Sequence, residues 1–103
     1  MDIIHQLQWR YATKSFNKTK YISQEKLEVL YQAFNLTATS YGLQPIKLVV
    51  LHNKELQADL VQHSMNQKQI AQASHVLVFC IETNIDEAFV TEYFNRVHAI
   101  RNI

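Results

Sequence analysis

The spacing of apolar residues predicts two helices at the start of the chain. Residues 2–9 have the helical pattern, with Asp2 as a capping residue, and we expect a short helix there. Residues 10–22 are polar and irregular, which indicates a loop. A stronger amphipathic pattern follows Ser23, a second capping residue, and fades at Thr37, where hydroxyl side chains compete for the backbone.

Two aliphatic segments predict β-strands separated by helices. The strands are expected at residues 46–51 and 75–82, which are rich in Val, Ile and Leu. Between them, the pattern predicts one helix at 53–64, capped by its first residue, and a shorter helix at 66–73. After the second strand, Asn84 resembles the cap of a last helix that is apolar over more than one face.

The resulting order is α-α-β-α-α-β-α, which we assign to the α+β class as a single domain over residues 1–103. Both strands are apolar on both faces, a pattern typical of the covered centre of a sheet. A sheet of only two strands is marginal without further cover. We therefore expect the chain to pack against additional chain, a second subunit, or both.

Charge and composition exclude several classes of protein. The formal net charge is +1, from 10 basic and 9 acidic residues, which gives no basic surface for nucleic acid. No apolar run approaches the ~20 residues of a membrane span. The opening residues lack a secretory signal pattern, so we expect a cytoplasmic protein. The single cysteine, Cys80, excludes an internal disulfide and is expected to be a packed, unreactive thiol within a strand.

The scarcity of glycine restricts how a nucleotide could bind. Gly42 is the only glycine, whereas a dinucleotide-binding fingerprint needs three and a phosphate-binding P-loop needs two. Any nucleotide must therefore be held by side chains and helix ends.

Three polar segments could hold such a ligand. Arg10 and Lys14 are two cations four residues apart, suited to a phosphate, although each could instead be solvated beside Asp2 or a glutamate. Residues 37–45 offer hydroxyls and free backbone amides, or else form an ordinary connection. Residues 66–69 offer side-chain amides that can read a uracil-like ring edge, or else cap a helix.

The histidines give no sign of a metal or catalytic site. None of the five forms a pair at the spacing of metal ligands, and no carboxylate joins them. We expect each to be a surface or strand-end residue. No set of catalytic residues is assigned.

Four motifs in order, MDII, RYATKSF, SYGLQP and NQKQIAQASHVLVFC, resemble the N-terminal half of the nitroreductase family. The resemblance implies a truncated nitroreductase-like α/β sandwich fold. It also implies an FMN-dependent oxidoreductase, a homodimer that passes electrons from NAD(P)H to nitroaromatics or quinones.

The same resemblance assigns roles to individual residues. Arg10 would bind the FMN phosphate, Lys14 would reach the N1/O2 side of the flavin, and Asn66 would face its pyrimidine edge. A loop at 38–40 would touch the flavin of the other subunit. The full set that the resemblance implies at the cofactor is Arg10, Tyr11, Ala12, Lys14, Ala38, Thr39, Ser40, Asn66 and Gln69.

This sequence departs from the family pattern at three of those positions. Ala12 replaces a common serine, Ala38 a common proline, and Gln69 a common lysine. The family's second half, with further strands and another cationic phosphate contact, has no counterpart within these 103 residues. Two alternatives therefore remain: a truncated, non-catalytic remnant that self-associates as an interaction module, and a small adaptor without a ligand.

Overall fold

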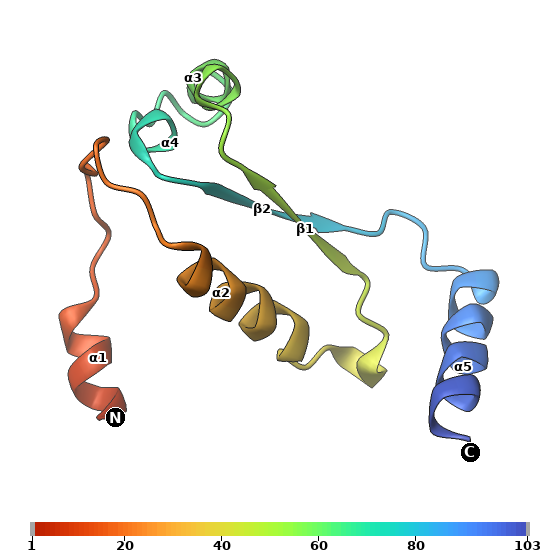
Figure 1. The fold of residues 1–103 in the computed structure, drawn as a ribbon. Coiled ribbons are helices and arrows are strands. Elements are labelled where there is room, and N and C mark those ends of the chain that lie inside the picture. The colour runs from red at the N-terminus through yellow and green to blue at the C-terminus, as the bar shows by residue number, and fades with distance from the viewer. Residues whose placement is uncertain (1, 103) are drawn as a thin grey trace. The chain divides into compact units, whose positions relative to one another are not determined.

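The computed structural model describes residues 2–102 and has the expected mixed helix and strand composition (Figure 1). The order α-α-β-α-α-β-α is confirmed, with one additional 3₁₀ helix, η1, before the first strand. The elements are α1 (Ile3–Trp9), α2 (Gln24–Leu36), η1 (Ser40–Gly42), β1 (Ile46–Leu51), α3 (Lys54–Val61), α4 (Gln69–Gln72), β2 (Val76–Ile81) and α5 (Glu87–Arg101). None of the helices among residues 2–102 is long and apolar enough to cross a membrane.

Helices α1, α2 and α3 begin at the capping residues that the sequence predicts. The Asp2 carboxylate accepts hydrogen bonds from the amides of Ile4 (3.1 Å) and His5 (3.3 Å). The hydroxyl of Ser23 accepts from the amide of Lys26 at 3.2 Å. Asn53 caps α3 in the same way. Each cap satisfies amides that the helix itself leaves without partners.

The helices between the strands are shorter than expected. α3 ends at Val61 instead of residue 64, because Met65 and Asn66 take left-handed backbone conformations, with φ of 58° and 55°. The amide of Asn66 donates to the carbonyl of Val61 at 3.0 Å and closes a turn. α4 consequently begins at Gln69, not at residue 66.

The cap of the last helix also differs from the residue that the sequence pattern predicts. Asp86, not Asn84, is the N-cap of α5, and its carboxylate accepts from the amide of Phe89 at 2.9 Å. The Asn84 side chain instead donates to the second oxygen of Asp86 at 3.1 Å. A carboxylate next to the helix start is favoured there by the helix dipole.

Contacts within the chain cluster into two units. The first unit comprises residues 2–22 and 51–76, with α1, α3 and α4; the second comprises 23–50 and 77–102, with α2, η1, α5 and most of the sheet. The assignment of residues 1–103 to a single domain stays a prediction.

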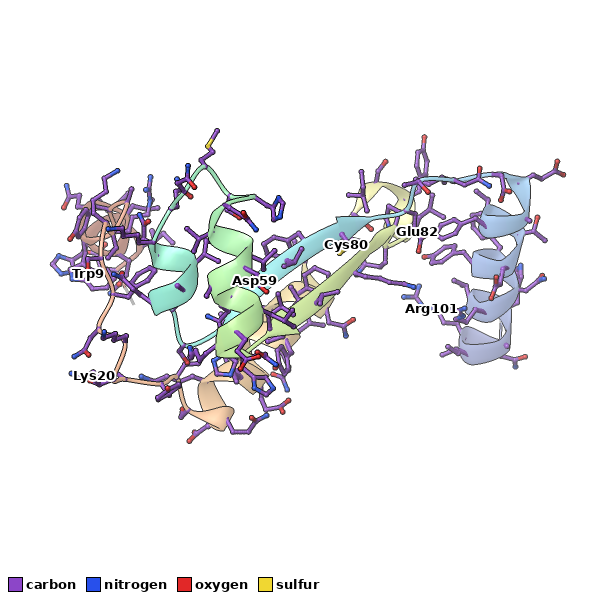
Figure 2. All side chains as sticks on the ribbon, turned by 90° about the horizontal axis from the view of Figure 1, so that it is seen from above. Trp9, Lys20, Asp59, Cys80, Glu82 and Arg101 are labelled. Carbon is purple, nitrogen blue, oxygen red and sulfur yellow. The ribbon has the colours of Figure 1, made fainter. Side chains whose placement is uncertain are left out.

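In the second unit, several apolar strand residues are exposed and the others are only partly buried. β1 and β2 form a two-stranded sheet, and the amide of Glu82 donates to the carbonyl of Pro45 at 2.9 Å. Phe34 of α2 stacks on Phe79 of β2, with ring centroids 5.8 Å apart, yet Phe79 is 68% exposed. Cys80, labelled on β2 in Figure 2, is half-buried, so its thiol is less enclosed than the sequence suggested.

In the first unit, a buried glutamine joins α3 to α4. The side chain of Gln57 is fully buried, and its Nε2 donates to the carbonyls of Ile70 (3.0 Å) and Ala73 (2.9 Å). These two bonds fix the end of α4, a helix of only four residues that could not be stable by itself.

Candidate functional site

The predicted phosphate-binding cations lie on an exposed segment after α1. That helix ends at Trp9, and Arg10 is its C-cap, with extended backbone and its amide bonded to the carbonyl of Gln6 at 3.1 Å. The residues that follow, through Lys14, are irregular, and both cationic side chains are exposed. The segment therefore presents its side chains to solvent within the first unit.

Two glutamines of α4 hold this segment in place. Gln69 Nε2 donates to the carbonyl of Thr13 at 3.4 Å. Gln72 Oε1 accepts from the amide of Phe16 at 2.9 Å and from the hydroxyl of Ser15 at 3.4 Å. These contacts lie on both sides of Lys14, so they restrict the backbone from which its side chain extends. We refer to Gln69 and Gln72 together as the glutamine clamp.

Neither cation is neutralised by a carboxylate among residues 2–102. The ion pair found in that part of the chain joins Arg96 and Glu92 of α5, at 3.1 Å. Asp2, the acid named in the alternative interpretation, uses one oxygen to cap α1. The two cations are consequently available for an anionic ligand.

The remaining predicted residues of the first unit are accessible. Tyr11 is 74% exposed, and Ala12 and Asn66 are exposed as well. Asn66 occupies the left-handed turn after α3, and its side-chain amide makes no hydrogen bond to residues 2–102. The structure does bring Gln69 to the cationic segment, but through the Thr13 carbonyl.

The loop at residues 38–40 belongs to the second unit and is closed by its own hydrogen bonds. The Thr39 hydroxyl donates to Gln44 Oε1 at 2.6 Å and accepts from the Gln44 amide at 2.9 Å. Gln44 Nε2 in turn reaches the carbonyl of Asn35 at 3.0 Å. Ala38 and Ser40 are exposed beside this closed loop.

Gln72 is the residue that sequence reasoning missed. Its signal was present, because Gln69 and Gln72 are three residues apart and so share one helix face. Nothing in the sequence indicated which backbone groups that face would meet, since the partners are 56 and 57 residues away.

Comparison with known proteins identifies the family. A model described as "Nitroreductase family" matches residues 7–101, and the chain belongs to that family. A protein of Staphylococcus epidermidis named as an NAD(P)H nitroreductase is 38% identical over 84 residues, which cover 81% of this chain and 38% of the relative. The major NAD(P)H-flavin oxidoreductase of Aliivibrio fischeri is 39% identical over 82 residues, covering 75% of this chain and 38% of the relative.

Solved structures confirm the fold. A nitroreductase-like protein of Streptococcus mutans superposes with a TM-score of 0.80 at 22% identity, over 97% of this chain and 48% of that one. The chain thus spans less than half the length of these relatives.

Proposed function

We propose that this chain forms the N-terminal part of an FMN site in an oxidoreductase that passes electrons from NAD(P)H to nitroaromatics or quinones. The observation that carries the proposal is the pair of unneutralised cations, Arg10 and Lys14, the second of which lies between residues held by the glutamine clamp. The flavin oxidoreductase of Aliivibrio fischeri supports the choice of a flavin. We propose a cytoplasmic location for this reaction, in keeping with NAD(P)H as its electron donor.

The two cations have different tasks in this proposal. The planar guanidinium of Arg10 can hold two phosphate oxygens at once, whereas Lys14 provides a single mobile charge. A positive charge beside the N1/O2 side of a flavin stabilises the negative charge that develops there on reduction. When bound, FMN would supply the redox chemistry, which is the acceptance of hydride and the transfer of electrons to the acceptor. The chain would supply binding, orientation and charge.

The other assigned residues complete the proposed contacts. The free amide of Asn66 suits the pyrimidine edge, which presents donors and acceptors. Tyr11 and Ala12 would border the phosphate, and Gln69 would act by fixing Thr13. Residues 38–40 would reach the flavin of a second subunit in a homodimer. Because Ala12 has no hydroxyl, we expect weaker phosphate binding than a serine there would give.

Titration of the purified chain with FMN, followed by quenching of flavin fluorescence, tests the proposal. Arg10→Ala and Lys14→Ala should each weaken binding about tenfold or more, since a hydrogen bond to a charged group contributes about 1.5–3 kcal/mol. Lys18→Ala is the matched control, because it removes an exposed cation of the same loop that has no assigned contact. Equal losses in all three variants, or no binding at tens of micromolar FMN, would refute the proposal.

A second candidate function, self-association as a non-catalytic module, is favoured by the exposed apolar residues of the sheet. Val49 is 45% exposed and Ile81 is 75% exposed, and Leu27 is the buried apolar residue among those described. An apolar groove of about 360 Å³, lined in part by Phe34, Leu48 and Phe79, adds to this surface in the second unit. Light scattering at increasing concentration tests this function, and a monodisperse monomer without flavin would contradict it.

A further inference from the structure

Two histidines lie side by side where neighbouring strands begin and end. His52 directly follows β1 and His75 directly precedes β2, and these strands are paired in the sheet. Their imidazole rings have centroids 5.6 Å apart and planes inclined by 53°. The two residues are 23 positions apart in the sequence, so their adjacency is a product of the fold.

A fixed hydroxyl orients one of the rings. Ser74 Oγ lies 2.6 Å from His75 Nδ1, and the same oxygen accepts the backbone N–H of Ile22 at 2.8 Å. When Nδ1–H donates to this hydroxyl oxygen, Nε2 is the unprotonated nitrogen left for a ligand. Histidines that bind metals commonly have their second ring nitrogen hydrogen-bonded in this way, which sets the tautomer and the ring orientation.

The positive charge nearest to the pair is engaged within the chain. The Lys54 ammonium, two residues after His52, is held by the carbonyls of Ala73 (2.5 Å) and Ser74 (3.2 Å) and lies 5.1 Å from the ring centroid of Tyr21.

We propose that His52 and His75 form a two-histidine site for a late first-row divalent cation such as Ni²⁺, Cu²⁺ or Zn²⁺, with water as the remaining ligands. Metal–nitrogen bonds of about 2.0–2.1 Å place the centres of two bound imidazoles about 5 Å apart, close to the observed 5.6 Å between the two ring centroids. Imidazole suits these ions, whereas Mg²⁺ and Ca²⁺ prefer oxygen ligands. Neither histidine is among the residues assigned to the flavin, so the metal site does not depend on the proposed function.

Calorimetric titration of the untagged full chain with NiCl₂ near neutral pH tests the site. His52→Ala and His75→Ala should each weaken Ni²⁺ binding about tenfold or more, because two ligands held together bind far better than one. His5→Ala is the control, since it removes an exposed histidine of α1. Binding unchanged in either strand-end variant, or equally weakened in the control, would overturn the proposal, as would competition by MgCl₂.

Zn²⁺ titration of the unmodified chain, followed by the imidazole resonances in NMR spectra, tests the proposal without any substitution. The resonances of His52 and His75 should shift together, at one metal ion per chain. A shift of other histidines first, or of only one of these two, would overturn it.

Discussion

At the scale of single residues, the glutamine clamp fixes the backbone on both sides of Lys14, one of the two cations of the proposed site. A cation on a free loop samples many positions, whereas Lys14 extends from backbone that is bonded on both sides. Resemblance to the family predicts Arg10, Lys14 and Gln69 as site residues. The role of Gln72 could not be predicted, because it depends on which backbone groups the fold brings to α4.

Replacement by glutamate should have opposite effects at the two glutamines of the clamp. Gln72 acts only as an acceptor, so Gln72→Glu should preserve protection of the Phe16 amide against hydrogen exchange, and Gln72→Ala should lose it. Gln69 acts as a donor to Thr13, so Gln69→Glu should release that carbonyl and weaken FMN binding several-fold. Loss of Phe16 protection in Gln72→Glu, or unchanged FMN binding in Gln69→Glu, would contradict this account.

His75 predicts a dependence of stability on pH. Its pKa in the folded chain is lowered from 6.5 by partial burial, by His52 and by Lys54, so the unfolded chain takes up its proton first on acidification. The full stability contribution is therefore present above pH 6.5 and is lost as the pH falls below that value. In urea unfolding between pH 7.5 and 5, His75→Gln should flatten this decline. An unchanged pH profile, or an equal effect of His5→Gln, would contradict it.

At the scale of elements, the first three caps and both strands were predictable, with β2 one residue shorter at each end than the expected 75–82, whereas the cap of α5 and the ends of the helices between the strands were not. Ser23 and Asn53 cap the expected helices, and β1 occupies the expected residues 46–51. These signals are local, because a capping side chain bonds to amides two or three residues away. The C-terminal end of α3 and the start of α4 depend on left-handed conformations at Met65 and Asn66, for which the sequence carries no glycine signal.

The turn before β1 gives a prediction for stability. Gly42 has φ of 67°, and a β-carbon added to it would lie 2.8 Å from Tyr93 Oη. Gly42→Ala should lower the free energy of unfolding by about 1–2 kcal/mol from the left-handed backbone alone, with a further loss from the contact. The same substitution in a Tyr93→Phe background should cost less, because the hydroxyl is gone. Equal costs in both backgrounds, measured by urea unfolding, would show that the contact has no effect.

At the scale of the whole molecule, the chain has the family fold and leaves apolar side chains of its sheet exposed. Because both strands are apolar on both faces, the sequence predicts that the sheet needs further cover. Phe79 and Ile81 are exposed, as this prediction requires. The meeting of His52 and His75 was beyond the sequence, since it follows from the pairing of two strands whose register no local pattern fixes.

The most direct test of the central claim compares FMN with riboflavin, which has the same ring system and no phosphate. If Arg10 and Lys14 hold the phosphate, the chain should bind FMN at least about tenfold more tightly than riboflavin, and Arg10→Ala should remove most of that difference. Equal affinities for the two flavins in the unmodified chain, or an unchanged ratio in Arg10→Ala, would contradict the account.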